Sequence, residues 1–394
     1  MKNPVVFCNH FARPGWLDGA EVSLLQIMKA LPADQFERYL LSPANGELLN
    51  LAERSGIQTR ILPLDLMWTM GGLVELETTG HHTLQQHLES LLNKDSREIF
   101  RLKRLLREIH PKTMLVNTSV NVTPAVIGKR LGIRIIWFIR EYFRGQLPAT
   151  GMILNQFADE IWVASSAMEN LLQTIPHLQK PVVRIPNFID ISNLEETKWP
   201  EYRSEIRKKL GIVSHQIAIG YWGSISPQKG IADFLEMAQK LNRKYPGRLK
   251  FCIAGCAIKD AYLRSALAMT QRLNLQSLVV FPGFFPDSQR FLPGMDIMVV
   301  PSHFNETFSR SALEALVYLK PVVAYAGGGI GDIVKHEQNG FLVSKGAIDQ
   351  LASYCSGLVD NPGLRHTLGI NGRQWVDAHF TVSSVASFLS RAFL

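Results

Sequence analysis

One stretch of the chain, Asp296 to Ala326, constrains the fold more than any other. It reads DIMVVPSHFNETFSRSALEALVYLKPVVAYA, which predicts a buried strand, a polar turn, a helix and a second buried strand. Short apolar strands of this kind are typical of parallel sheets that are covered on both faces. Ser309 is placed to cap the helix and Pro321 to stop it. The stretch therefore predicts an α/β fold with a ligand site where the strands end.

Two glutamates of this stretch, Glu306 and Glu314, are candidates for that site. Ligands of open α/β sheets bind outside the carboxyl ends of the strands, where helix N-termini attract anions. A carboxylate there repels phosphate, so we expect Glu306, at the mouth of a cleft, to face neutral hydroxyls such as those of a sugar. Glu314 lies on nearly the same helix face, because eight residues return to within about 80° of the starting direction. It can then reach a ribose diol, although solvated positions for both glutamates are the alternative.

The glutamate pair, set in PSHFNETFSRSALEALVYLKPVVA, resembles the signature of the retaining nucleotide-sugar glycosyltransferases of family four. Further motifs resemble that family and occur in its order along the chain. They are LDGAEVSLLQIMKAL from Leu17, GYWGSISPQKGIADFLE from Gly220, FCIAGC from Phe251, VVFPGFFP from Val279 and AGGGIGDIVKHEQNGFLV from Ala326. The last of these resembles a Gly-rich turn followed by a hairpin-like stretch. The resemblance covers nearly the whole chain and is weakest from Leu66 to Lys94.

The alternation of strands and helices along the chain agrees with the fold that the resemblance implies. This is the GT-B fold, an α/β architecture of two facing, Rossmann-like, doubly wound domains with a deep interdomain cleft. The first series of strands, from VVFC to VVRIPNF, predicts a six- or seven-stranded parallel domain. We place an acceptor-side domain over 1–192 and a nucleotide-sugar donor domain over 193–380. Residues 381–394 are apolar at helical spacing, and the resemblance implies that they pack back onto the first domain.

The resemblance also implies which residues bind the donor. Lys229 falls on the position of a lysine that holds the donor diphosphate, and Glu306 and Glu314 would bind the sugar and the ribose. Gly19 would let the backbone approach the phosphates. The implied donor-binding set is Gly19, Lys229, Glu306, Thr307, Phe308, Ser309, Arg310 and Glu314. No cofactor or metal is implied, since the donor is a nucleotide diphosphate sugar and the sequence lacks the clustered aspartates that hold divalent ions.

The chain departs from the family pattern at the diphosphate clamp. The family usually carries an arginine five residues before the lysine, but Ser224 stands there and cannot supply a planar charged fork. Arg140, at the end of a predicted first-domain strand, is a candidate to replace that charge. We therefore predict Glu306, Lys229 and Arg140 as catalytic residues. Candidates for acceptor or sugar contacts are His10, Glu141 and His303.

Charge and cysteine content limit the partners only broadly. A net charge of +8 favours anionic partners, among them nucleotides, phospholipid headgroups and nucleic acids. No nucleic-acid motif supports the last of these. The segment 97–110 predicts a basic amphipathic helix whose apolar face includes Ile99, Phe100 and Leu102. Its basic face is either solvated or a peripheral membrane contact. The four cysteines show no disulfide or zinc spacing, and no apolar run is long enough to span a bilayer. We expect a cytoplasmic protein, or one bound peripherally at the inner face of the membrane.

These observations favour a retaining, metal-independent glycosyltransferase of hexosyltransferase type. It would move a sugar from a nucleotide diphosphate sugar to an acceptor hydroxyl, in the synthesis of a cell-surface glycan or a lipid-linked saccharide. One alternative is a nucleotide-sugar epimerase or sugar-phosphate synthase of the same fold. Another is a protein that binds nucleotides or polyanions without turnover, which the serine at position 224 favours. The sequence leaves open the base, the sugar, the acceptor, the linkage and the oligomeric state.

Overall fold

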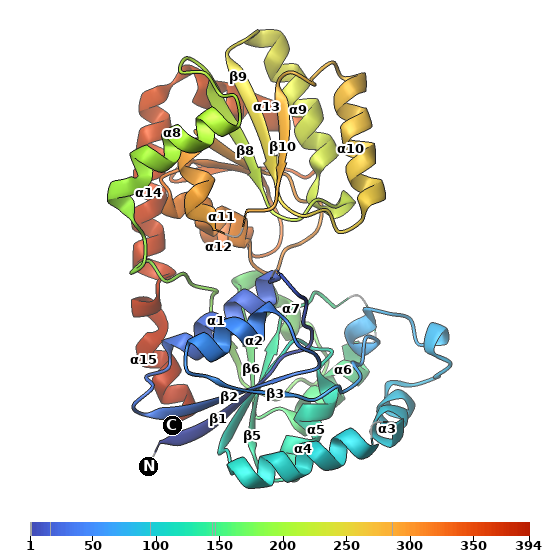
Figure 1. The fold of residues 1–394 in the computed structure, drawn as a ribbon. Coiled ribbons are helices and arrows are strands. Elements are labelled where there is room, and N and C mark those ends of the chain that lie inside the picture. Colours follow the sequence, from blue (N-terminus) through green and yellow to red (C-terminus); the bar gives the residue numbers. More distant parts are fainter. Residues whose placement is uncertain (1, 16, 95, 144, 146, 286) are drawn as a thin grey trace. The chain divides into compact units, whose positions relative to one another are not determined.

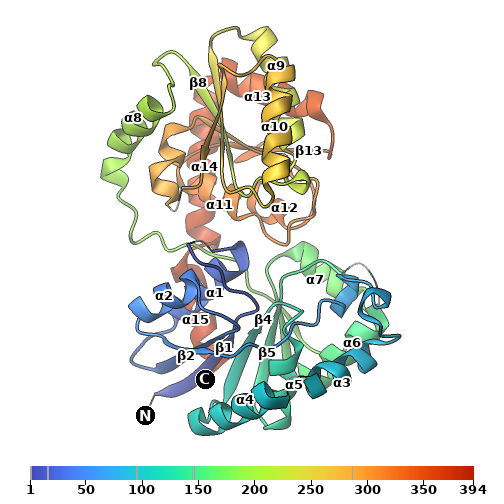
Figure 2. The same ribbon diagram turned by 45° about the vertical axis from the view of Figure 1, so that its right-hand side comes forward.

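The computed structural model describes residues 2–15, 17–94, 96–143, 145, 147–285 and 287–394. The chain forms two compact domains. The first contains the residues up to Ile189 together with Val382–Leu394, and the second contains Asp190–Thr381. Figures 1 and 2 show a parallel sheet flanked by helices in each of them.

The first domain is built on a seven-stranded parallel sheet with the order β3-β2-β1-β4-β5-β6-β7. The strands are β1 Asn3–Cys8, β2 Phe36–Ser42, β3 Gln58–Ile61, β4 Thr113–Asn117, β5 Arg134–Ile139, β6 Glu160–Val163 and β7 Val182–Arg184. The helices are α1 Gly19–Ala30, α2 Glu47–Arg54, α3 Leu84–Lys94, α4 Ser96–Ile109, α5 Val122–Arg130, α6 Leu147–Phe157 and α7 Ser166–Gln173. Helices α1 and α2 cover one face of the sheet and α3 to α6 the other (Figure 1). The central strands are buried on both faces, as their apolar runs predict.

Helix α15, Val382–Phe393, belongs to the first domain although it is last in the sequence. It packs beside α1 (Figure 1). The Phe393 ring lies 5.5 Å from the Phe7 ring and 5.6 Å from the Trp162 ring, between centroids. The Asn3 side chain donates a hydrogen bond to the backbone oxygen of Phe393 at 2.6 Å. The start of β1 and the end of α15 therefore lie next to each other.

The second domain is built on a six-stranded parallel sheet with the order β10-β9-β8-β11-β12-β13. The strands are β8 Ile217–Trp222, β9 Leu249–Ala254, β10 Val279–Gly283, β11 Ile297–Val300, β12 Val322–Tyr325 and β13 Gly340–Val343. The helices are α8 Trp199–Lys209, α9 Ile231–Lys244, α10 Asp260–Arg272, α11 Arg310–Val317, α12 Ile330–Ile333, α13 Ile348–Asp360 and α14 Pro362–His379. Helices α9, α10 and α13 lie on one face, and α11 and α14 on the other (Figure 2). Each sheet reverses its strand order at the first strand of its domain, which is the arrangement of doubly wound folds.

Two local features differ from what the sequence predicts. The stretch before Val343 turns back on itself, with the Glu337 N–H donating to the Gly340 oxygen at 2.8 Å, but it ends in strand β13, which pairs in parallel with β12 and adds a strand to the predicted series. Phe100 does not belong to the apolar face of α4. Its side chain is 66% exposed, whereas Ile99 and Leu102 are buried. Adjacent residues of a helix differ by about 100° in direction, so Phe100 is turned away from the face that contains Ile99.

Candidate active site

The loops that follow β8 and β11 meet at the carboxyl edge of the second sheet. The backbone N–H of His303 donates to the backbone oxygen of Gln228 at 2.9 Å. Gly230 has a φ of +71°, and a Cβ atom there would lie 1.8 Å from the backbone oxygen of Pro301. Only a glycine permits this approach. The contact brings the residue before Gly230, Lys229, toward the loop that contains Glu306.

Lys229 and Glu306 form an ion pair at this edge. The Lys229 Nζ lies 2.7 Å from the Glu306 Oε1, and the two side chains are 30% and 12% exposed. Partial burial strengthens such a pair relative to a surface salt bridge. Both residues line a small pocket. Its lining is Tyr221, Trp222, Gly223, Lys229, Val300, Ser302, Glu306 and Ser311.

Glu314 is held next to Trp222, a residue of the pocket lining, by two hydrogen-bond donors. The Trp222 indole N–H donates to Glu314 Oε2 at 2.8 Å, and Arg310 Nη2 donates to Glu314 Oε1 at 3.0 Å. Arg310 and Glu314 are one turn apart on α11, and the Trp222 ring stacks on Phe291 at 5.4 Å. The structure thus gathers Lys229, Glu306, Arg310 and Glu314 around Trp222.

Phe308 and Ser309, which lie between the two glutamates, present little side chain to a ligand. Phe308 is buried, and its ring packs edge-on against Phe380 at 5.7 Å. Ser309 occupies the N-cap position of α11 but, contrary to the expectation, its side chain makes no capping hydrogen bond. Its hydroxyl lies 3.3 Å from that of Ser311. The buried side chains of Phe308 and Ser309 leave the backbone of this segment as the part that can contact a donor, with Thr307 half-buried beside it.

His303 belongs to a separate polar network at the same edge. Its Nε2 lies 2.9 Å from the Asp233 Oδ2, and the Tyr325 hydroxyl donates to the same oxygen at 2.5 Å. Burial and the nearby Asp233 carboxylate raise the pKa of Tyr325. The hydroxyl therefore stays protonated and acts as a donor to Asp233.

The Gly-rich turn after β12 supports the loop that contains Glu306. A Cβ atom at Gly328, whose φ is +65°, would lie 2.2 Å from the backbone oxygen of Glu306, and Gly329 N–H donates to that oxygen at 2.7 Å. Lys345, after β13, hydrogen-bonds the Asn305 side chain. The turn thus has a backbone packing role.

The first domain places its predicted site residues at the carboxyl edge of its own sheet. Gly19 begins α1, where Asp18 and Glu21 form a capping box. Burial, followed by the charge of Asp18, raises the pKa of Glu21 to about 7. His10 is buried, with its Nε2 3.9 Å from Asp18 Oδ2, and burial lowers its pKa. His10 is therefore neutral near pH 7.

Arg140 is fixed by amide oxygens and by an aromatic ring. Its Nε donates to Asn117 Oδ1 at 2.5 Å, its Nη1 donates to Asn187 Oδ1 at 2.9 Å, and its guanidinium lies 3.7 Å from the centre of the Phe138 ring. The next residue, Glu141, accepts hydrogen bonds from two backbone N–H groups. Arg140 is thus presented as a rigid planar cation.

Several buried polar groups near Arg140 have no hydrogen-bond partner among the described residues. They include the Asn117 Nδ2, the Thr118 and Ser119 hydroxyls and the His10 Nδ1. Thr118 also has a φ of +75°, which is rare for a β-branched residue. Unpaired buried polar groups are uncommon in proteins, and they concentrate where a ligand or water completes them.

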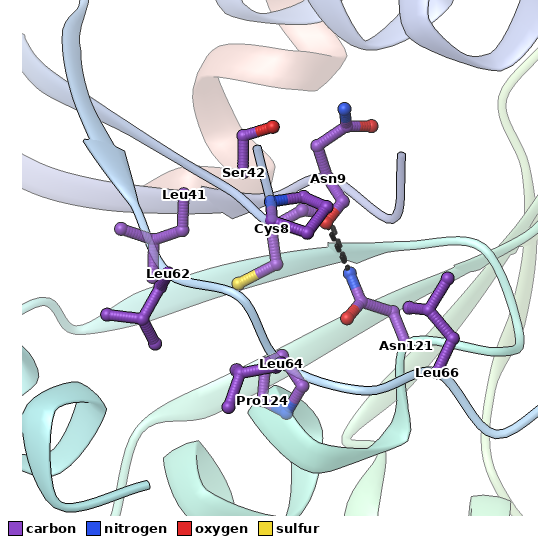
Figure 3. Close-up of a pocket in the computed structure, with 10 residues that line it drawn as sticks. Cys8, Asn9, Leu41, Ser42, Leu62, Leu64, Leu66, Asn121 and Pro124 are labelled. Carbon is purple, nitrogen blue, oxygen red and sulfur yellow. Dashed lines mark hydrogen bonds between the residues drawn. The ribbon is translucent and has the colours of Figure 1, made fainter. Parts of the chain in front are cut away.

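A mostly apolar pocket lies in the same domain, at the ends of β1, β2 and β3 and the start of α5. Figure 3 shows the Asn121 side chain directed toward the backbone oxygen of Asn9, at 3.1 Å. The apolar lining residues are Leu41, Pro43, Leu62, Leu64, Leu66 and Pro124. Burial raises the pKa of Cys8 in this lining, so its sulfur remains a thiol.

No helix in the described part of the chain is long and apolar enough to cross a membrane. Among the described residues, no three histidine, cysteine, aspartate or glutamate side chains are grouped so that they could hold a metal ion.

Known proteins resemble this chain in sequence and in fold. Residues 202–375 match the family model described as Glycosyl transferases group 1. HepE of Anabaena, solved in complex with UDP and glucose, has a TM-score of 0.81 at 20% identity, over 98% of both chains. WaaG, a glycosyltransferase involved in lipopolysaccharide biosynthesis, has a TM-score of 0.70 at 15% identity, over 98% of this chain and 99% of its own. The chain therefore has the GT-B fold.

Sequence relatives extend this likeness. The alpha-D-kanosaminyltransferase of Streptomyces kanamyceticus is 26% identical over 48% of each chain. The capsular polysaccharide biosynthesis glycosyltransferase CapM of Staphylococcus aureus is 24% identical over 57% of this chain and 58% of its own. The chain spans about half the length of the curated relatives that it matches. The family model and these relatives confirm the resemblance of the chain to the family-four glycosyltransferases.

Proposed function

We propose that the protein is a retaining glycosyltransferase that moves a hexosyl group from a nucleotide diphosphate sugar to an acceptor hydroxyl without a metal ion. The observation that carries this proposal is the pairing of Lys229 with Glu306 at 2.7 Å, beside a Glu314 held by Trp222. The ammonium group suits a diphosphate, and the two carboxylates suit sugar and ribose hydroxyls.

The chemistry follows from charge development in the transition state. As the bond between the anomeric carbon and the diphosphate oxygen breaks, negative charge grows on the leaving phosphate. Lys229 and the N-terminus of α11 stabilise that charge, and such preorganised groups are most effective where water is excluded. The acceptor oxygen bonds to the same face of the anomeric carbon, and its proton passes to the departing phosphate oxygen. The products are the glycoside and a protonated nucleoside diphosphate.

The first domain would contribute the acceptor side. The unpaired amide and hydroxyl groups near Arg140 suit an acceptor rich in hydroxyls, such as a growing saccharide. His10 and Glu141 would take part in these contacts. Arg140 would add positive charge toward the donor or an anionic group of the acceptor. The relatives named for kanosaminyl transfer and for capsular polysaccharide biosynthesis support a glycan or a glycosylated small molecule as product.

A peripheral membrane contact would suit a lipid-linked acceptor. Helix α4 exposes Phe100 beside Arg101 and Arg104, although these arginines also pair with Glu98 and Glu108. We infer that this surface contacts anionic lipids. Co-sedimentation with vesicles of phosphatidylglycerol should decrease in a Phe100→Ser variant. Equal sedimentation of variant and wild type would contradict the inference.

Incubation with a panel of nucleotide sugars tests the function. Glu306→Ala and Lys229→Ala should each abolish transfer while the circular dichroism spectrum stays unchanged. Release of free nucleotide that depends on an acceptor supports transfer. Formation of an epimer, or tight nucleotide binding without any release, would instead support one of the alternative functions.

A further inference from the structure

The pocket lined by Lys229, Glu306 and Trp222 has a second ion pair next to it. Lys229 pairs with Glu306 at 2.7 Å, and Arg310 pairs with Glu314 at 3.0 Å. Trp222 joins the two pairs, because its ring lines the pocket and its indole N–H donates to Glu314. Arg310 approaches from the first turn of α11, and the residue after it, Ser311, lines the pocket as well.

These four groups balance one another in charge. Two cations and two carboxylates sum to zero, and the four side chains are all at most 30% exposed. A nucleotide diphosphate sugar has a complementary composition, because each phosphate carries a negative charge while the sugar and the ribose are neutral hydroxyl donors. The phosphates can pair with the two cations, and the hydroxyls can donate hydrogen bonds to the two carboxylates.

The loop after β8 cannot supply two cations by itself. Residues 223–230 read GSISPQKG, in which Lys229 is the single basic residue. Ser224 provides no charge. Arg310 lies on the neighbouring element, and the carboxylate that it contacts is bonded to Trp222, two residues before Ser224. A guanidinium also matches the geometry of phosphate oxygens, since it can donate two parallel hydrogen bonds.

We propose that Arg310 is the second diphosphate-binding cation of this site, and that Glu314 holds it in position until the donor arrives. This inference rests on the proposed function. On donor binding, Arg310 turns toward the diphosphate and the ribose diol replaces it at Glu314. Trp222 is a positioning residue, because its indole N–H keeps Glu314 in place during the exchange.

Calorimetric titration of inorganic pyrophosphate, and of UDP, GDP and ADP, tests the proposal. Arg310→Met should weaken the binding of pyrophosphate and of the preferred nucleotide at least tenfold. Glu314→Gln should strengthen pyrophosphate binding threefold or more, because it releases Arg310 from its carboxylate. The matched control is Arg264→Met, which removes an exposed arginine of α10 in the same domain and should leave binding unchanged.

Two further variants separate charge from folding. Ser224→Arg in the Arg310→Met background should restore binding to within threefold of wild type, because it supplies a guanidinium from the other loop. The double variant Arg310→Met and Glu314→Gln removes both members of the ion pair, so the Glu314 carboxylate is not left without its cation. This variant should bind pyrophosphate as weakly as Arg310→Met alone.

The outcomes distinguish this inference from the proposed function. If wild type binds a nucleotide and Arg310→Met binds it equally well, the role of Arg310 is refuted while the transferase function stands. If wild type binds none of the nucleotides and transfers no sugar from any donor, the proposed function fails and this inference fails with it.

Discussion

The close approach of Gly230 to Pro301 makes a quantitative prediction about how the donor site is held together. In Gly230→Ala, the new Cβ atom would start 1.8 Å from the Pro301 oxygen, so the two loops have to separate by roughly 1 Å or more. The positive φ of +71° adds about 1–2 kcal/mol for any residue with a Cβ atom. The loop separation adds about 1–3 kcal/mol, typical of an overpacked site. We therefore expect the second domain to lose about 2–5 kcal/mol of unfolding free energy.

Gly247→Ala is a matched control for the backbone cost. Gly247 has a φ of +75°, and a Cβ atom there would have no neighbour within 4 Å. The unfolding free energy of this variant should fall only by the conformational cost of a positive φ, about 1–2 kcal/mol. Urea unfolding of both variants gives the difference directly, because the two substitutions add the same methyl group to the same domain.

Function should separate the two variants more sharply than stability. Gly230 adjoins Lys229, and a displacement of about 1 Å at a reacting centre can cost about 100-fold in rate. Gly230→Ala should lower sugar transfer at least tenfold, while Gly247→Ala should transfer at the wild-type rate. If the two variants showed equal stability and equal transfer, the contact between the two loops would have no role in placing Lys229.

Three further predictions concern the first domain. Because the pKa of Glu21 is raised to about 7, the folded state holds a proton that the unfolded state releases near pH 4.5, so stability falls as the pH rises between these values. Glu21→Gln should remove this loss. Between pH 4.5 and 8, the unfolding free energy of this variant should rise by up to about 3 kcal/mol relative to wild type. A difference between the two proteins that does not depend on pH would contradict the raised pKa of Glu21. Phe393→Ala should lower the unfolding free energy by about 3–5 kcal/mol in thermal or urea unfolding, because the ring is fully buried. Leu394→Ala, at an exposed position, should lower it by less than about 0.5 kcal/mol. Similar losses in the two variants would show that Phe393 does not anchor α15. Arg140→Lys retains the charge but cannot reproduce the fork that contacts two asparagines, so kcat should fall at least tenfold with little change in stability; an unchanged kcat would leave Arg140 a structural role.

The fold could be predicted because buried parallel strands leave a strong trace in the sequence. Runs such as IIWFI, residues 135–139, are apolar throughout, and apolar residues of the helices between such runs repeat at the helical period. The strand β13 was missed because GFLV is short, begins with glycine and follows a polar turn, so nothing local distinguishes it from a hairpin arm. Its parallel pairing with β12 depends on contacts that no local pattern records.

The site could be predicted only where charge or motif spacing marked it. Lys229 and Glu306 are charged residues in polar loops, and the structure brings them together. Trp222 was missed because an aromatic residue at the end of an apolar strand is indistinguishable from core, and its partner Glu314 is 92 residues away. Asn117 and Asn187 were missed because neutral amides leave no recognisable spacing pattern in a sequence. Both bind Arg140, which lies between them in the chain and far from each.

The placement of α15 has a practical consequence for dissecting the protein. Expression of residues 1–189 alone would leave the surface around Phe7 and Trp162 without its covering helix, and an exposed aromatic patch of this kind favours aggregation. Because Asn3 contacts Phe393, a short flexible peptide could join residue 394 to residue 1. A circularly permuted fragment that begins at Val382, runs through this joint and ends at Ile189 would then carry the whole first domain as a single continuous polypeptide.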